Sequence, residues 1–290
     1  MRWLITGSYG QLGTDLQKVL AEKLDDVVRA VDVDVLDITD SAAVNAAVDE
    51  FAPDVLVNAA AYTAVDAAEE NEELAFKVNA TGPAVLAAAV ARGAGRLIHV
   101  STDYVFAGDG MVPYEIGDTP DPKSAYGRTK LAGELAVREL LPDASYVVRT
   151  AWVYGGAGAN FVKTMIRLEG ERDTVSVVDD QRGSPTWSAD LARALAELGR
   201  SSAAAGTYHC TGAGDTTWFG LTQAIFEELG ADPGRVLPTT TDAFPRPAPR
   251  PAYSVLSDAA WRGAGLTPMP HWRDALHSAF ATVGDQLRGG

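Results

Sequence analysis

The chain has 290 residues, of which 47% are hydrophobic, and its formal net charge is −15. This size permits one large domain or a domain with a smaller lobe, while the acidic charge argues against nucleic-acid binding. Cys210 is the single cysteine, which excludes an internal disulfide. No apolar run is long enough to span a bilayer, and the N-terminus enters a strand without a signal peptide. We therefore expect a cytoplasmic protein with no membrane partner.

The N-terminal segment reads as a strand, a glycine turn and a helix. Residues 3–6 form a short apolar run, the sequence GSYGQLG follows at 7–13, and a helix is expected to begin near Thr14. Here Gly7 permits a tight turn, Gly10 lets the backbone approach a pyrophosphate, and Gly13 lets helix and strand pack closely. Because the helix N-terminus then faces the phosphates, the pattern predicts dinucleotide binding.

The second strand, residues 27–31, is followed by acidic residues. Asp32 lies about 20 residues beyond the glycine turn, where a carboxylate suits the adenosine ribose hydroxyls. The alternative is a solvated loop carboxylate, because Asp34 and Asp37 crowd the same loop. No Arg or Lys lies inside the glycine turn or just after the strand to accept a 2′-phosphate. This favours NADH over NADPH.

The next elements continue the alternation of strand and helix. Thr39 and Asp40 are candidate caps of the second helix. Residues 53–61 form a third strand that ends in small residues, a loop follows at 62–66, and the next helix contains Asn79. Small side chains at the carboxyl end of a strand leave room for a ligand above the sheet. Strands and helices of these lengths predict parallel βαβ units.

The fourth strand, residues 96–103, ends in the polar residues Ser101, Thr102 and Asp103. A hydroxyl at the carboxyl end of a strand can hydrogen-bond a substrate carbonyl oxygen as that oxygen gains negative charge. The alternative is that the hydroxyl caps a helix or turn.

Tyr126 and Lys130 are four residues apart at the start of a predicted helix. This spacing places both side chains on one helical face. A fixed ammonium favours the phenolate, so we expect Lys130 to lower the pKa of Tyr126 toward neutrality. A phenol with such a pKa can act as a general acid or base. The alternative is a chance helical pair.

Taken together, six segments resemble an extended short-chain dehydrogenase/reductase and, within that superfamily, the dTDP-4-dehydrorhamnose reductases. The resemblance extends from Met1 to about Trp272, nearly the whole chain. The segments are GSYGQLG at 7–13, NAAAYTAVD at 58–66, STDYVF at 101–106, YGRTKLAGE at 126–134, RTAWVY at 149–154 and DQRGSPT at 180–186.

The resemblance implies a Rossmann-type, doubly wound parallel α/β sheet with a smaller C-terminal substrate-binding lobe. Residues 1–150 would form the dinucleotide-binding domain, with parts of 151–230 returning to it. Residues 151–290 would mainly form the substrate-binding lobe. The activity implied is reduction of the C4 ketone of dTDP-4-dehydro-β-L-rhamnose to dTDP-L-rhamnose with NADH or NADPH.

The resemblance also implies roles for individual residues. Tyr126 would donate the proton, Lys130 would hold the nicotinamide ribose, Thr102 would hydrogen-bond the carbonyl oxygen, and Asn79 would support a water linked to the lysine. The expected cofactor contacts are Gly7, Gly10, Gln11, Leu12, Gly13, Asp32, Asp37, Ile38, Ala61, Tyr62, Thr63, Val100, Tyr126 and Lys130. The expected substrate contacts are Thr102, Asp103, Phe106, Trp152, Asn160 and Arg250.

Two of the substrate contacts have alternatives. Trp152 looks like a sugar-contacting aromatic, but core packing is an alternative because tryptophan is buried on average. Arg250 lies in the Pro-rich run 245–251 and is a candidate for the substrate diphosphate, because guanidinium matches phosphate oxygens bidentately. A solvated loop arginine is the alternative. Thr186 is a candidate cap for the helix that carries Asp190.

A metal site finds little support in the sequence. Some relatives are described as dimers bridged by Mg²⁺ through carboxylates, and Asp15 and Asp190 lie at two of the corresponding positions. The third position falls near Thr282, which has no carboxylate. The four histidines are scattered, so zinc is not expected. A monomer and a homodimer are both consistent with the sequence.

Three other functions stay open. One is a related dTDP-deoxysugar 4-ketoreductase. Another is a non-catalytic dinucleotide-binding protein similar to the regulatory subunit of methionine adenosyltransferase, although Thr102, Tyr126 and Lys130 are all present. The third is an epimerase or dehydratase of the same superfamily; dehydratases typically carry an acidic pair at the strand tip, where Thr102-Asp103 supplies one acid.

Overall fold

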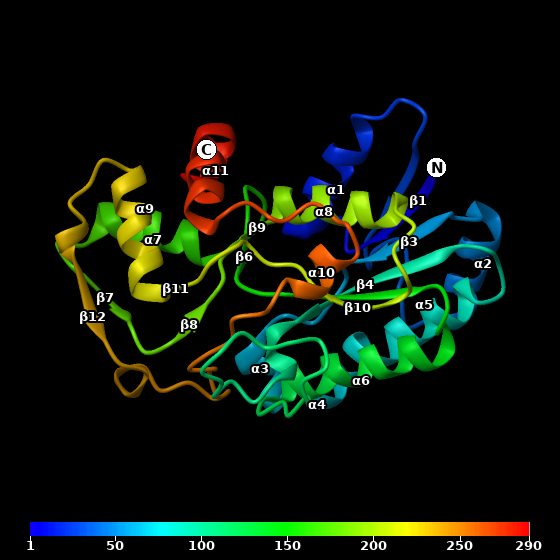
Figure 1. Ribbon diagram of the computed structural model, residues 1–290, viewed down its shortest axis with the longest axis horizontal. Helices are drawn as coiled ribbons and strands as arrows, with labels where there is room; N and C mark the ends of the chain where they lie inside the picture. The colour runs from blue at the N-terminus through cyan, green and yellow to red at the C-terminus, as the bar shows by residue number, and fades with distance from the viewer. Residues whose placement is uncertain (290) are drawn as a thin grey trace.

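A central sheet of six parallel strands organises the computed structural model, which describes residues 1–289 (Figure 1). The strand order is β10-β5-β4-β3-β1-β2, and every pairing is parallel. The order reverses between β1 and β3, which opens a crevice at the carboxyl ends of the strands. The predicted Rossmann-type sheet is confirmed. The strands are β1 (Arg2–Thr6), β2 (Val27–Val31), β3 (Val55–Asn58), β4 (Arg96–Thr102), β5 (Ser145–Thr150) and β10 (Gly206–His209).

Helices cover both faces of this sheet. Helices α1 (Gln11–Ala21) and α8 (Ser188–Arg200) pack on one face, and α2 (Ser41–Phe51), α5 (Gly82–Val90) and α6 (Ala125–Leu140) pack on the other. Successive strand residues alternate between the two cores, so Leu4 and Leu56 face one side while Ile5 and Val57 face the other. Burial on both faces explains the continuous apolar runs of these strands.

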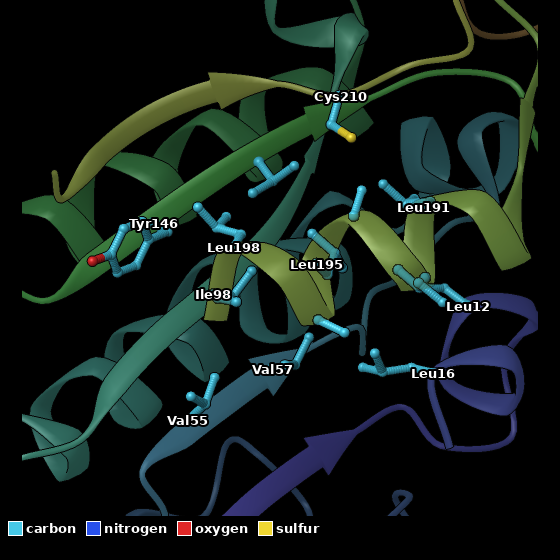
Figure 2. Close-up of a cluster of buried hydrophobic side chains, with 14 of the residues drawn as sticks. Leu12, Leu16, Val55, Val57, Ile98, Tyr146, Leu191, Leu195, Leu198 and Cys210 are labelled. Carbon is cyan, nitrogen blue, oxygen red and sulfur yellow. The ribbon is translucent and has the colours of Figure 1, made fainter. Parts of the chain in front are cut away.

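The core between α1, α8 and the sheet also draws on the later part of the chain. Figure 2 shows side chains of α1 and α8 meeting those of β3, β4 and β5, with Cys210 at the same cluster. Cys210 is buried, as a small hydrophobic residue would be. Trp261 of α10 (Ala259–Gly263) and Leu266 also pack into this cluster. The sequence did not predict that residues beyond 230 return to this core.

A second, smaller group of elements packs around its own hydrophobic core, at the left of Figure 1. Its helices contribute residues such as Met165, Ile225 and Leu276 to that core. The helices are α7 (Phe161–Glu171), α9 (Trp218–Glu228) and α11 (Trp272–Leu287). The strand pairs are β7 (Val175–Val178) with β12 (Val236–Thr239), β8 (Arg182–Gly183) with β11 (Thr216–Thr217), and β6 (Val153–Tyr154) with β9 (Thr186–Trp187).

Several predicted element boundaries differ from the structure. Helix α1 begins at Gln11 rather than near Thr14, because Gly10 is extended and its carbonyl already accepts from the Thr14 amide. Helix α3 (Val65–Glu70) begins inside the predicted loop 62–66. The following helix has three parts, α4 (Glu72–Phe76), the π-turn η1 (Lys77–Thr81) that contains Asn79, and α5.

The predicted caps had mixed outcomes. Asp40 caps α2, because its carboxylate accepts from the Ala42 and Ala43 amides. Thr39 is not the cap; its hydroxyl donates to Asp37. The prediction for Thr186 is wrong: it lies in β9, and its hydroxyl donates to the Ser184 carbonyl and accepts from the Gly212 amide.

None of the helices within residues 1–289 has both the length and the apolar composition to cross a bilayer.

Candidate active site

A cavity of about 1500 Å³ lies at the carboxyl ends of the central strands and continues into the second group of elements. One end is lined by the glycine turn after β1 and by residues at the ends of β3, β4 and β5. The other end is lined by α7, β7 and the segment after β12. All expected cofactor contacts line this cavity. Among the expected catalytic and substrate residues, Asn79, Phe106 and Asn160 do not.

The glycine turn brings the start of α1 close to the backbone of β1 and β3. Gly7 has φ +75°, and a Cβ there would lie 2.5 Å from the Ala60 nitrogen. A Cβ on Gly13 would lie 2.2 Å from the Gly7 carbonyl oxygen. No side chain caps α1 at Gly10. The first-turn amides therefore open onto the cavity, an arrangement that fits a pyrophosphate.

At the end of β2 the structure separates the acidic residues that the sequence left together. The Asp32 carboxylate lines the cavity and is held by the Tyr9 and Val33 amides, both at 2.8 Å. Asp34 does not line the cavity and accepts from the Tyr9 hydroxyl. Hydrogen bonds from Thr39 hold the pKa of Asp37 below its ordinary value. The carboxylate available to an adenosine ribose is thus that of Asp32.

Tyr126 and Lys130 lie in the first turns of α6, whose N-cap is Ser124. Lys130 is 1% exposed, and its ammonium donates to the Val100 carbonyl of β4 at 2.7 Å. Burial lowers the pKa of Lys130 to about 8. Burial raises the pKa of Tyr126 to about 12, with the Thr102 side chain opposing the shift.

The prediction that Lys130 brings the Tyr126 pKa toward neutrality is therefore wrong for this structure. The Lys130 ammonium is directed to the β4 backbone, and desolvation of the phenol dominates. A phenol with a pKa of about 12 is protonated at neutral pH, which is the state that a proton donor needs.

Thr102 and Asp103 form a buried polar pair beside Tyr126. The Thr102 hydroxyl donates to Asp103 Oδ1 at 2.9 Å and accepts from the Tyr104 amide at 3.2 Å. Thr102 therefore caps the short helix η2 (Asp103–Val105) and also lines the cavity. Burial raises the pKa of Asp103 to about 6, with the neighbouring Ser254 and Thr102 side chains opposing the shift.

Asn79 serves the site from outside the cavity. Its side-chain amide donates to the Tyr62 carbonyl and to the Thr129 hydroxyl, both at 3.1 Å, and its oxygen accepts from the Tyr62 amide at 2.8 Å. These bonds use both amide hydrogens, while the side-chain oxygen keeps a second lone pair, so the expected water stays a prediction. Asn79 also ties the Tyr62 loop to helix α6.

Trp152 forms an aromatic wall with Trp218 and Phe161. Trp152 has φ +48° and stacks on Trp218 with ring centroids 3.5 Å apart, and Phe161 packs against Trp218 at 4.3 Å. The Trp218 indole donates to Gln181. All four residues line the cavity. The sequence did not predict Trp218, Phe161 and Gln181 as site residues, because only the fold brings these distant segments to Trp152.

Phe106 and Asn160 were expected to contact substrate, and the structure places both elsewhere. Phe106 is 2% exposed and stacks on Tyr114, with ring centroids 4.4 Å apart. Asn160 caps α7 through the Lys163 amide and donates to Gln11 Oε1 at 2.9 Å. Phe106 thus belongs to the core, and Asn160 shapes the end of a helix.

Arg250 lines the cavity but is already paired. Its Nη2 donates to Asp66 Oδ2 at 2.8 Å, and Asp66 Oδ1 also accepts from the Ala248 amide at 3.2 Å. These contacts attach residues 244–251, here called the strap, to the start of α3. In Figure 1 the chain after β12 runs toward α3 along the lower edge of the molecule.

The two carboxylates considered for a metal have protein partners. Asp15 accepts from Ser188 at 2.5 Å and from Lys18 at 2.9 Å, and Asp190 accepts from Arg193 at 2.6 Å. Within residues 1–289 no group of three or more His, Cys, Asp or Glu side chains is arranged to hold a metal ion.

The whole chain is similar to a set of bacterial reductases. The family model of the RmlD substrate binding domain matches residues 1–284. A dTDP-4-dehydrorhamnose reductase of Streptomyces griseus is 53% identical over 286 residues, covering 97% of this chain and 94% of that protein. A probable dTDP-4,6-dihydroxy-2-methyloxan-3-one 4-ketoreductase of Streptomyces antibioticus is 52% identical, with 98% and 96% covered. The solved dTDP-4-dehydrorhamnose reductase of Bacillus anthracis, in complex with NADP, has a TM-score of 0.92 at 41% identity and covers 97% of this chain and 98% of that one.

Proposed function

Because the chain belongs to the family of the RmlD substrate binding domain, we propose that it reduces the C4 ketone of dTDP-4-dehydro-β-L-rhamnose with NADH or NADPH. The product would be dTDP-L-rhamnose. Relatives named as reductases of dTDP-linked ketosugars match nearly the whole chain, which supports an NAD(P)H-dependent oxidoreductase.

The observation that carries this proposal is the convergence of Tyr126, Lys130 and Thr102 on one wall of the cavity. The glycine turn that fits a dinucleotide lines the same cavity. The cavity then continues past the aromatic wall into the second lobe. It therefore offers space for a cofactor and a nucleotide sugar on either side of the same three residues.

Each of these three residues has its own role in the proposed ketone reduction. When bound, the nicotinamide cofactor supplies the hydride that reduces the ketone carbon. Tyr126 gives its phenolic proton to the former carbonyl oxygen, which completes the alcohol. The Thr102 hydroxyl, which donates to Asp103 in this structure, would rotate to donate to that oxygen. Lys130, with a pKa of about 8, is mostly charged at neutral pH and binds the nicotinamide ribose.

The shape and polarity of the cavity lining support the other expected contacts with substrate and cofactor. The Trp152 ring suits the apolar face of a deoxyhexose, because it lines the cavity as part of the aromatic wall. The buried carboxyl of Asp103 is placed to bind a sugar hydroxyl. Asp32 is placed to bind the adenosine ribose, and its charge favours NADH. A relative binds NADP, so both cofactors belong in the assay.

Three alternatives have different standing. A related dTDP-ketosugar reductase is supported by the Streptomyces antibioticus relative. A non-catalytic binding protein fits less well, because Tyr126, Lys130 and Thr102 all line the cavity. For a dehydratase, the second acid at the strand tip is missing, since Asp103 follows Thr102 and precedes Tyr104.

We also propose that the protein is a monomer or a homodimer and that it is located in the cytoplasm. We propose no nucleic-acid or membrane partner for it.

The test is oxidation of NADH and NADPH with and without enzymatically generated dTDP-4-keto-L-rhamnose. Substrate-dependent loss of reduced cofactor, with dTDP-L-rhamnose as product, is expected. Tyr126→Phe should lower turnover roughly 10²- to 10⁴-fold, the usual contribution of a general acid, and should still bind cofactor. Tyr9→Phe is the matched control, because it removes a phenol outside the cavity. Near-normal turnover by Tyr126→Phe would contradict the assignment of the donor.

A further inference from the structure

The charged side chains on the cavity wall are mainly acidic. The carboxylates are those of Asp32, Asp37, Asp66, Asp103 and Asp242, and the whole chain carries a net charge of −15. A nucleotide sugar has two negative charges on its diphosphate, so binding requires local positive charge. The cations on the described part of the wall are Lys130, Arg246 and Arg250.

Two of these three cations are committed to other contacts. Lys130 is buried under the β4 strand end and donates to the Val100 carbonyl. Arg250 is paired with Asp66 and donates a second bond to the Ala248 carbonyl at 3.0 Å. Removing Arg250 from Asp66 would leave that carboxylate unpaired, so the diphosphate would have to compete with an existing ion pair.

Arg246 is the remaining cation, and it lies on the strap four residues before Arg250. Its side chain is exposed, lines the cavity and has no ion-pair partner within residues 1–289. Arg246 also lies near Asp66, the residue to which the strap is attached. Its charge helps to lower the pKa of the Asp66 carboxyl.

The backbone around Arg246 is restricted before any ligand binds. The strap reads FPRPAPRP, so proline precedes and follows Arg246. Proline fixes its own φ and confines the preceding residue to extended conformations. The hydrogen bonds that Ala248 and Arg250 donate to Asp66 then hold the strap at the cavity. Less conformational freedom is therefore lost when Arg246 binds an anion.

We infer that Arg246, rather than Arg250, binds the diphosphate of the nucleotide-sugar substrate; this inference rests on the proposed function. The guanidinium donates two parallel N–H bonds to phosphate oxygens, and its charge offsets the acidic wall. Arg250 is a positioning residue that holds the strap through Asp66. The diphosphate subsite is thus built on the strap, in the same cavity that Tyr126 and Thr102 line.

The test is calorimetric titration of the full chain with thymidine 5′-diphosphate and, separately, with thymidine. Arg246→Ala should weaken binding of the diphosphate on the order of 10- to 100-fold, as expected for charge-assisted bonds, and leave thymidine binding unchanged. Arg246→Lys should restore part of the affinity, because the charge remains and the fork does not. Arg167→Ala is the matched control, since Arg167 is an exposed arginine of α7 that does not line the cavity.

The possible outcomes distinguish a failure of the Arg246 assignment from a failure of the proposed function. If the unmodified chain prefers the diphosphate to thymidine and Arg246→Ala keeps that preference, the inference is wrong while the proposed function stands. If Arg246→Ala weakens both ligands equally, Arg246 does not read the diphosphate, and the inference is again wrong. If the unmodified chain binds neither ligand, the dTDP-sugar function fails and the inference falls with it. Unchanged cofactor affinity in Arg246→Ala confirms an intact fold.

Discussion

Asp103 combines burial with incomplete hydrogen bonding. Its residue is 3% exposed, Oδ1 accepts from Thr102, and Oδ2 has no protein hydrogen-bond partner among the described residues. A buried carboxylate that is only partly satisfied costs free energy, and such groups are found preferentially at functional sites. The cost at Asp103 is consistent with a side chain whose second oxygen is kept for a substrate hydroxyl.

This cost predicts how stability depends on pH. The folded-state pKa of Asp103 is about 6, above its ordinary value of 3.8. The protein therefore loses stability at this group as pH rises from about 4 to about 6, and the penalty is constant above that. Asp103→Asn does not titrate, so it should be about 1–3 kcal/mol more stable than the unmodified chain at pH 8, with no advantage below about pH 4.

Urea unfolding at both pH values measures this difference. An advantage of the same size at low and high pH would contradict the titration of Asp103. The same variant should bind substrate less tightly, which would link the stability cost to function.

At the residue scale the sequence predicted which residues line the cavity better than it predicted their burial and contacts. The spacing of Tyr126 and Lys130 and the tip of β4 marked residues that the structure brings to one cavity. The pKa of Tyr126 was predicted in the wrong direction, because the sequence does not show that the phenol is buried. It also does not show that the Lys130 ammonium donates to the Val100 carbonyl. Phe106 lies just after η2 and packs into the core on Tyr114, because a motif identifies a residue without specifying which way its side chain points.

Helix α6 is the element on which the candidate chemistry depends. Its first turns carry Tyr126 and Lys130, and Glu134 forms a buried ion pair with Arg149 of β5 at 2.6 Å. On its other side, Gly133 lies against the π-turn η1, where a Cβ would be 2.1 Å from the Asn79 carbonyl oxygen. The position of the helix is thus fixed by a charge pair toward the sheet and by a close backbone contact toward η1.

Gly133→Ala tests this contact. The added methyl group must displace α6 or η1, so we expect a loss of about 1–3 kcal/mol in the free energy of unfolding. We also expect at least about 10-fold lower turnover, because Lys130 lies one turn away and small displacements of catalytic groups are costly. Chemical denaturation and steady-state kinetics measure the two effects.

Gly170→Ala is the matched control for that variant. Gly170 is exposed in α7, and nothing lies within 4 Å of a Cβ there. This change should leave turnover unaltered and add up to about 1 kcal/mol of stability. Equal behaviour of the two alanine variants would show that the contact between α6 and η1 does not position the site.

At the element scale the βαβ alternation predicted the sheet, its parallel strands and most helices. It did not predict the π-turn at Asn79, because the sequence around it continues an ordinary helical pattern. It also did not predict the start of α1, because Gly13 inside the first turn resembles a loop residue. In both places a close approach of backbones determines the local structure.

At the scale of the whole molecule, the cavity lies between two hydrophobic cores. The sheet and its glycine turn line one part of the cavity, α7 and β7 line another part, and the strap also lines it. The sequence predicted a second lobe but not which residues of it reach the cavity. The aromatic wall joins residues 152, 161 and 218, and the strap meets α3 across more than 180 residues. Contacts of this range follow from chain topology rather than from any local pattern.

The pair Asp66–Arg250 is a side-chain contact that attaches the strap to helix α3. Burial opposes ionisation of Asp66, but hydrogen bonds from Arg250 and Ala248 hold its pKa below the ordinary value. The side chains of Asp66 and Arg250 are 32% and 20% exposed, so the pair should add at most about 1 kcal/mol to global stability. Its main effect should be local, because the strap otherwise lacks regular secondary structure.

Asp66→Asn and Arg250→Gln should therefore loosen the strap while leaving the fold intact. Proline has no amide hydrogen, so hydrogen exchange in residues 244–251 reports on the few other amides, including that of Ala248, which donates to Asp66. Each variant should exchange faster in this segment and raise KM for the nucleotide sugar roughly 3- to 10-fold, because a strap that is not preorganised binds at a greater entropic cost. The double variant should be little worse than either single variant, since both remove the same interaction. Additive increases in KM, with exchange unchanged, would instead show that Arg250 contacts the substrate independently of Asp66.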